Sequence, residues 1–298
     1  MRILIAGSSG FLGTRLARAL TADRHEVRTL VRRQARTAAE SRWEPDRGRV
    51  DPGVIAETDA VINLAGANVG GRRWTAEYKR QLRDSRIDTT ATLARAMAEA
   101  DAPPKILLNS SAVGYYGDTA DRPVDEQSPA GTGFLADLCR DWEAATAPAQ
   151  AAGVRVAHLR TGFPLDRDEG FLKPLMFVFR LGIGGTLGSG DQYLPWIALP
   201  DWLAAVRFLL EHDVAGPVNL TGPNPVTNAA FTRALGRQLH RPTLLPVPRP
   251  ALRVALGEFA TEALASQRAL PGVLTAAGFD FRYQDVTSAL RWAVNHGD

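Results

Sequence analysis

Short apolar runs alternate with longer amphipathic stretches through the first 165 residues of the chain. The apolar runs have the length of buried strands and lie at residues 1–6, 60–64, 105–109 and 154–159, and residues 26–31 are predicted as the second strand. Apolar residues at helical spacing predict helices at residues 13–22, 75–100 and 134–151. Strands that alternate with helices form parallel sheets covered on both faces, so the pattern predicts a doubly wound α/β fold.

After residue 161 the pattern changes. Glycines cluster at residues 182–190, and a helix at 201–211 and a strand at 217–220 are predicted beyond them. The tail from residue 243 is rich in proline before two further helical stretches. We therefore predict a main domain and a smaller, discontinuous C-terminal α/β lobe. The main domain comprises residues 1–164 with 196–224, and the lobe comprises residues 165–195 with 225–298.

Composition narrows the class of protein. With 298 residues, 45% of them hydrophobic and 22% charged, the chain is long and apolar enough for a globular core. The net charge is +3, and basic residues are interleaved with acids, so we expect no nucleic-acid partner. The single Cys139 excludes an internal disulfide, and no Cys/His spacing suggests a metal site. Without a leader pattern or a long apolar run, we expect a cytoplasmic protein with no membrane span.

A glycine-rich loop follows the first predicted strand and opens the first helix. Residues 7–13 read GSSGFLG, and three glycines at this spacing allow a sharp turn, close approach to a pyrophosphate and tight helix packing. The loop predicts a Rossmann-type dinucleotide site, in which these residues contact the pyrophosphate at the helix N-terminus: Gly7, Ser9, Gly10, Phe11 and Leu12. An ordinary strand-to-helix turn is the alternative.

The end of the second strand indicates which dinucleotide is bound. An NAD site usually has an acid there for the ribose 2′-hydroxyl, but this chain has Arg32 and Arg33, and no acid before Glu40. Guanidinium groups grip phosphate through paired hydrogen bonds, so the sequence favours NADP(H) over NAD. Alternatively, both arginines only solvate a loop.

Several motifs together resemble a known family. They are GSSGFLG at residues 7–13, NLAG at 63–66 and SSAVGYYG at 110–117, with further matches at 73–75, 85–87, 188–197 and 219–227 and at Phe279 and Phe281. The sequence resembles the extended short-chain dehydrogenase/reductase superfamily. It is most similar to the atypical, sugar-nucleotide-epimerase-like subgroup of the NAD-dependent epimerase/dehydratase family.

The resemblance implies additional contacts with the nucleotide. Leu64, Ala65, Gly66 and Ser110 match cofactor-binding positions, and the backbone of Phe163, Pro164 and Leu165 is expected beside the nicotinamide. The main domain is then an NADP-binding domain and the lobe a substrate lobe. By family analogy, the helices at 75–100 and 134–151 allow a homodimer.

The resemblance also implies a catalytic serine, tyrosine and lysine. Ser111 matches the serine, although it could equally cap a strand end or touch the ribose. The Tyr-x-x-x-Lys segment should fall at residues 134–139, which contain neither residue. Tyr115 and Tyr116 are the nearest substitutes in sequence, and packing beneath the loop is their alternative role.

Three other positions depart from the family or leave a choice open. Arg86 stands near a helix asparagine of related enzymes and either helps to bind an anion or pairs with Asp84 or Asp88. Trp43 is an aromatic lid over the adenine or a core residue, and Ala198 replaces a frequent histidine.

The predicted function is that of an NADP(H)-dependent oxidoreductase or epimerase acting on a small polar substrate, for which a nucleotide sugar is one candidate. Because the tyrosine and lysine are missing, the alternative is a non-catalytic NADPH sensor or scaffold.

Overall fold

The computed structural model describes residues 1–243 and 246–295, and the chain divides into two compact units. Unit 1 comprises Met1–Ser111, Leu138–Leu159 and Val206–Pro217. Unit 2 comprises Ala112–Asp137, Arg160–Ala205 and the chain from Val218 onward. The predicted domains are defined by which ligand each would bind, whereas these units are defined by compactness. The predicted division into a nucleotide domain and a substrate lobe therefore stays a prediction.

Within the described residues, seven strands form one sheet in the order β11-β7-β5-β4-β1-β2-β3. Their bounds are β1 Arg2–Ala6, β2 Glu26–Val31, β3 Glu40–Arg42, β4 Ala60–Asn63, β5 Ile106–Ala112, β7 Arg155–Thr161 and β11 Gly216–Leu220. The pairs β1–β2, β1–β4, β4–β5 and β2–β3 run parallel. The order winds outward from β1 in both directions, so the predicted doubly wound sheet is confirmed.

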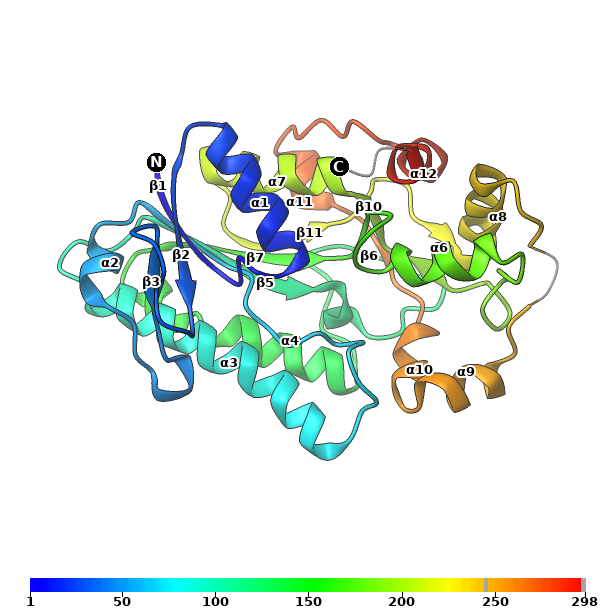
Figure 1. Ribbon diagram of the computed structural model, residues 1–298, viewed down its shortest axis with the longest axis horizontal. Coiled ribbons are helices and arrows are strands. Elements are labelled where there is room, and N and C mark those ends of the chain that lie inside the picture. Colours follow the sequence, from blue (N-terminus) through cyan, green and yellow to red (C-terminus); the bar gives the residue numbers. More distant parts are fainter. Residues whose placement is uncertain (244–245, 296–298) are drawn as a thin grey trace. The chain divides into compact units, whose positions relative to one another are not determined.

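Helices cover both faces of this sheet in unit 1. Helix α1 (Phe11–Ala22) lies on one face, and α3 (Ala76–Glu99) lies on the other, with the short α2 (Pro52–Ala56) at one end (Figure 1). Helix α3 starts where Thr75 accepts a hydrogen bond from the Tyr78 N–H at 3.1 Å, a typical N-cap. Apolar side chains from the strands and from α3, among them Leu4, Val61, Leu93 and Leu107, form the core of the unit.

The single helix predicted at residues 134–151 is wrong, because two helices occupy this stretch. Helix α4 spans Phe134–Ala144 and α5 spans Ala147–Ala151. Pro148 has no N–H to donate to the carbonyl four residues earlier, and its ring clashes there, so the helix cannot run through. The Thr146 hydroxyl instead donates to the Glu143 carbonyl at 2.7 Å and supports the break.

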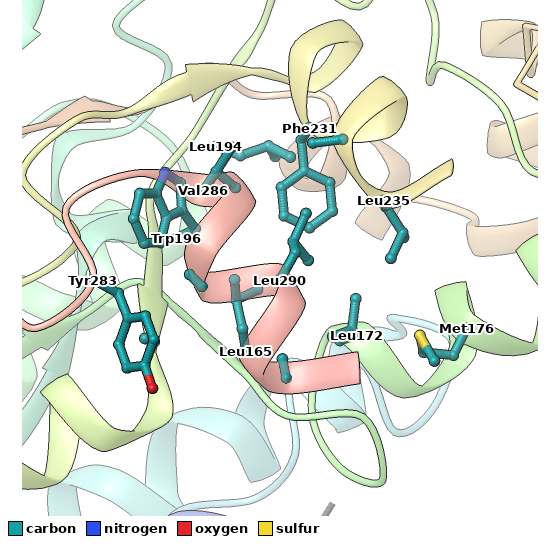
Figure 2. Close-up of a cluster of buried hydrophobic side chains, with 14 of the residues drawn as sticks. Leu165, Leu172, Met176, Leu194, Trp196, Phe231, Leu235, Tyr283, Val286 and Leu290 are labelled. Carbon is teal, nitrogen blue, oxygen red and sulfur yellow. The ribbon is translucent and has the colours of Figure 1, made fainter. Parts of the chain in front are cut away.

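Unit 2 is built around an apolar cluster in which short strands meet helices. Strands β8 (Phe163–Leu165) and β10 (Trp196–Ala198) pair in parallel, and α6 (Leu172–Arg180), α8 (Asn228–Leu239) and α12 (Val286–Asn295) pack around the same cluster. Figure 2 shows Val286 and Leu290 of α12 among side chains of α8 and α6, including Phe231 and Leu172. The predicted C-terminal region with both strands and helices is therefore present.

The remaining elements are short, apart from α7. They are the strands β6 Pro123–Val124, β9 Tyr193–Leu194, β12 Val226–Thr227 and β13 Arg268–Ala269, the 3-10 turns Pro45–Arg47 and Val113–Tyr116, and the helices α7 Leu199–Glu211, α9 Arg249–Leu256, α10 Phe259–Ala263 and α11 Gly272–Ala276. Among the residues of the tail that the structure describes, four helices are found instead of the two predicted. No helix among the described residues is long and apolar enough to cross a membrane.

Candidate functional site: a dinucleotide cleft in unit 1

The three glycines of the first loop occupy positions with different requirements. Gly7 has φ +83° and lies so close to the 64–65 backbone that a Cβ would come within 2.6 Å of Leu64. A Cβ on Gly13 would lie 2.2 Å from the Gly7 carbonyl oxygen. At Gly10, by contrast, the nearest atom to a Cβ would be the Gly7 carbonyl oxygen at an ordinary 3.4 Å. The protein's own packing therefore requires Gly7 and Gly13 but leaves room at Gly10.

The loop opens onto a cleft with a volume of about 1010 Å³. The cleft is lined by the glycine loop, the end of β2, residues 43–47, residues 64–67 and one face of α3. Eight predicted cofactor residues lie in this lining, namely Gly7, Ser9, Gly10, Arg32, Arg33, Leu64, Ala65 and Gly66. Phe11 and Leu12 are the first residues of α1, directly after Gly10. The carboxyl ends of β1, β2 and β4 thus meet at one ligand-sized cavity, as expected for an open α/β sheet.

The two arginines after β2 have different surroundings. The Arg33 guanidinium grips Glu40 through Nη2–Oε1 at 2.6 Å and Nη1–Oε2 at 2.8 Å. These hydrogen bonds, with one from the Arg36 N–H, lower the pKa of Glu40 to about 2. Arg32 is exposed and forms no hydrogen bond or ion pair within residues 1–243 and 246–295. Arg32 therefore has the available guanidinium, while Arg33 holds its own loop together.

The part of the cleft formed by α3 and the 43–47 segment carries acidic side chains together with Arg47 and Arg80. Asp84 and Asp88 come from α3, and Asp46 belongs to the 43–47 segment. Burial raises the pKa of Asp88, and the neighbouring charges of Asp84 and Asp46 raise it further. These carboxylates disfavour an anion close to them. The glycine loop and the end of β2, in contrast, contribute Arg32 and Arg33 and no acidic side chain to the lining. Trp43 lines the cleft and is also buried in the core of unit 1, at 4% exposure.

A buried polar network fixes the strand ends behind the cleft. The Asn63 amide donates to Thr90 Oγ1 at 3.0 Å and to Asn109 Oδ1 at 2.8 Å, and its own Oδ1 accepts from the Ala65 N–H. The Trp142 indole N–H donates to Thr90 Oγ1 at 2.9 Å. The network therefore joins β4, β5, α3 and α4 and positions the 64–67 loop.

Arg86 supports the same loop from α3. Its guanidinium donates to the carbonyls of Leu82 and Ala67, at 2.9 and 3.0 Å, and stacks 5.0 Å from the centre of the Trp142 ring. Burial lowers the pKa of Arg86. No ion pair from Arg86 to Asp84 or Asp88 is found among the described residues, so the pairing considered from the sequence is not made.

Ser111, the predicted catalytic serine, forms a hydrogen bond that the sequence did not suggest. It lies near the carboxyl end of β5, and its hydroxyl donates to Glu143 Oε1 on α4 at 2.6 Å. Glu143 is adjacent to Trp142, which the polar network holds in place. It stands four residues, about one helical turn, beyond the 134–139 segment that lacks tyrosine and lysine. Residues 139 and 143 lie on the same face of a helix, so Glu143 could have been considered as a candidate from the sequence.

The two candidate tyrosines lie in unit 2 and have polar partners there. The Tyr116 side chain is 2% exposed; its hydroxyl donates to Asn219 Oδ1 at 2.8 Å and accepts from Arg160 at 3.0 Å. Burial raises the pKa of Tyr116 to about 12. Tyr115 is half-buried, with the Arg160 guanidinium 3.4 Å from its ring centre. These contacts favour a structural role for Tyr116 and leave Tyr115 as the more accessible phenol.

The remaining predicted residues do not line the cleft in unit 1. Ser110 follows Asn109 on β5, and its carbonyl accepts a hydrogen bond from the Asn109 amide at 2.9 Å. Phe163, Pro164 and Leu165 form β8 in unit 2, where the Leu165 side chain is fully buried in the apolar cluster. Leu165 could therefore offer only its backbone to a ligand, and the nicotinamide contact expected of Phe163, Pro164 and Leu165 stays a prediction.

The fold and the cleft together define a dinucleotide-binding α/β protein. A family model described as the NAD dependent epimerase/dehydratase family matches residues 3–221. A second family model, described as a domain of unknown function (DUF1731), matches residues 247–293. The chain belongs to the NAD-dependent epimerase/dehydratase family, which confirms the resemblance seen in the sequence.

Relatives match nearly the full length of the chain. An epimerase family protein of Mycobacterium leprae is 50% identical over 294 residues, covering 98% of this chain and 95% of the relative. The crystal structure of human epimerase family protein SDR39U1 (isoform 2) with NADPH superimposes with a TM-score of 0.92 at 32% identity, covering 99% of this chain and 100% of that chain. A nucleoside-diphosphate sugar epimerase from Corynebacterium glutamicum gives a TM-score of 0.80 at 34% identity, covering 97% of this chain and 57% of that one.

Proposed function

We propose that this chain is an NADP(H)-dependent oxidoreductase or epimerase acting on a small polar substrate. The observation that carries the proposal is the cleft in unit 1, where a glycine loop with open space at Gly10 adjoins an unpaired Arg32. The space that a Cβ would fill at Gly10 is the space that a pyrophosphate needs to approach the backbone. The similar human protein, solved with NADPH, supports the choice of nucleotide.

The residues of the cleft suit separate parts of NADP(H). Ser9, Gly10 and the N-terminus of α1 would hold the pyrophosphate, since a helix N-terminus presents backbone N–H groups to an anion. Arg32 would bind the 2′-phosphate, and Ala65 and Gly66, positioned by Asn63 and Arg86, would support the rest of the nucleotide. When bound, the nucleotide supplies a hydride acceptor or donor.

Ser111 and Glu143 would handle the proton that accompanies hydride transfer. Ser111 donates its hydrogen to a carboxylate, which leaves its oxygen free to accept a hydrogen bond from a substrate hydroxyl. Ser111 is 4% exposed, so the proposal requires the substrate to reach a nearly buried hydroxyl. In the oxidative direction, the substrate proton would pass to Ser111 Oγ while the serine proton passes to Glu143, leaving serine unchanged and Glu143 neutral. In the reductive direction, the same proton would return. The pair would thus replace the missing tyrosine and lysine.

A nucleotide sugar is the substrate class that the relatives support best. The similar Corynebacterium glutamicum protein is described as a nucleoside-diphosphate sugar epimerase. The absence of tyrosine and lysine from residues 134–139, together with the buried hydroxyl of Tyr116, keeps a second candidate, an NADPH sensor or scaffold without turnover.

The two candidates differ in turnover, and three variants identify its source. We expect wild-type protein either to oxidise NADPH, seen as a loss of absorbance, with at least one carbonyl compound of a panel, or to convert at least one UDP-sugar into its epimer, seen by chromatography. The second readout is needed because an epimerase returns the hydride to its substrate and leaves the nucleotide absorbance unchanged. Ser111→Ala and Glu143→Gln should each lower that rate by about 10²-fold with little change in NADPH affinity, because a proton-transfer group acts mainly in the transition state. Asp141→Asn removes a charge from the same helix, but its partner is Arg83, so it should leave the rate unchanged.

These measurements distinguish an enzyme from a sensor and identify the proton donor. NADPH binding without turnover across the panel would favour the sensor. Full activity in both Ser111→Ala and Glu143→Gln would exclude this pair as the proton source and redirect attention to Tyr115.

A further inference from the structure

A second basic feature lies in unit 2, outside the cleft and its chemistry. Residues 214–257 contain five arginines and one histidine but no aspartate or glutamate. Basic residues are interleaved with acids along most of the chain, and this stretch is an exception. Positive charge gathered on a protein surface raises the local potential for anions.

Part of this stretch folds into a groove with a volume of about 490 Å³. It is lined by one face of α8 and the turn that follows, with Arg233, Arg237 and Arg241 as its charged residues and His240 beside them. Arg233 and Arg237 are four residues apart and so share a helix face, where like charges repel. Both are exposed, and neither forms an ion pair in the described part of the chain.

The groove is held in shape by the chain around it. The 241–243 segment packs so closely on α8 that a Cβ at Gly236 would lie 2.4 Å from Thr243 Cγ2 and 2.9 Å from the Arg241 carbonyl. Arg241 is anchored by its Nε–H, which donates to the Arg180 carbonyl at 3.1 Å. His240 takes a left-handed conformation, φ +53°, which a histidine adopts less readily than glycine. The local fold thus keeps Arg233, Arg237 and Arg241 around one groove, although His240 must adopt a less favourable backbone conformation.

We propose that this basic groove binds the phosphate or diphosphate group of a small molecule, at a site separate from the nucleotide cleft. The groove lies at the C-terminal end of α8, where the helix dipole disfavours anions, so the arginines must supply the attraction. Guanidinium groups match the geometry of phosphate oxygens through paired hydrogen bonds, which favours phosphate over a simple halide. The volume accommodates a small phosphorylated group.

The test is calorimetric titration of pyrophosphate into the full-length protein saturated with NADPH, which blocks the nucleotide cleft. We expect one saturable site in the wild type and at least a tenfold loss of affinity in Arg233→Ala/Arg237→Ala. Both positions are on the exposed face of a helix, so the melting temperature should change little. Arg249→Ala/Arg253→Ala removes the same charge outside the groove and should keep the affinity within about twofold.

Several results would overturn the proposal. Pyrophosphate could fail to bind the NADPH-saturated wild type, or the two double variants could weaken it equally, which would indicate general charge attraction. Binding of duplex DNA or of anionic lipid vesicles with no binding of pyrophosphate would also contradict a small phosphorylated ligand. Failure of NADPH itself to bind would be seen in a separate titration and concerns only the proposed function.

Discussion

At the scale of single residues, the glycine loop separates structural from ligand-related requirements. A sequence motif treats its three glycines alike, but only Gly7 and Gly13 are required by contacts within the protein. Gly10 is extended, with φ −82° and ψ 170°, a conformation open to any residue. The fold itself therefore does not require glycine at position 10, whereas the proposed contact with a pyrophosphate would.

This difference leads to a prediction for Gly10→Val. NADPH binding should be lost because a branched side chain fills the space of the pyrophosphate, while the melting temperature of the ligand-free protein should change little. Gly13→Ala is the matched control and should lower the melting temperature, since its Cβ would lie 2.2 Å from the Gly7 carbonyl oxygen. Unaltered NADPH affinity in folded Gly10→Val would refute this placement of the pyrophosphate.

Tyr116 gives a prediction about pH. Its pKa is raised to about 12 in the folded protein, mainly by burial, against about 10 in an unfolded chain. Ionisation therefore favours unfolding, and the stability that the neutral phenol allows is present below pH 10 and lost between about pH 10 and 12. The loss approaches about 3 kcal/mol. Urea unfolding from pH 9 to 11 should show a steeper decline for wild type than for Tyr116→Phe; parallel declines would contradict the assignment.

Whether a feature of the site could be predicted from the sequence depends on how far apart its residues are along the chain. The glycine loop and Arg32 are local signals and could be predicted directly. Arg33 and Glu40 are seven residues apart, and Ser111 and Glu143 are 32 apart. Their pairing depends on how a loop closes and where α4 packs, which residue spacing does not specify.

At the scale of elements, the strands and long helices of unit 1 follow the hydrophobic pattern. The predicted strand at 26–31 and helix at 75–100 agree with β2 and α3. Helix α8 was not predicted, although Thr227 caps it and Phe231 and Leu235 bury one face at helical spacing. Short strands such as β9 and β12 have only two residues each, too few to show any periodicity.

The buried network that joins four elements predicts the effect of Thr90→Val. The replacement has a similar shape but leaves the Trp142 indole N–H without its acceptor and the Asn63 amide with one fewer. Unsatisfied buried donors destabilise a fold by about 1–3 kcal/mol each. Equilibrium urea unfolding should show a loss in this range, whereas the exposed Thr21→Val should change stability by less than about 0.5 kcal/mol. Equal effects would mean that the network contributes little.

At the scale of the whole molecule, the fold is well defined by the family, but the reaction is not. The match to the human NADPH-bound structure extends over 99% of the chain, so the fold of the family is preserved throughout. The family's usual proton donor is nevertheless missing from residues 134–139. Fold similarity alone cannot assign a reaction, and the assignment depends on side chains such as Ser111 and Glu143.

The most direct test of the central claim is calorimetric titration of NADPH and NADH into wild type, Arg32→Ala and Arg33→Ala. We predict that wild type binds NADPH at least about tenfold more tightly than NADH, equivalent to roughly 1.4 kcal/mol. Arg32→Ala should remove most of this preference and leave NADH affinity nearly unchanged, while Arg33→Ala should retain more of it because Glu40 already occupies that guanidinium. Equal affinities of wild type for the two nucleotides, or no binding of either, would contradict the account.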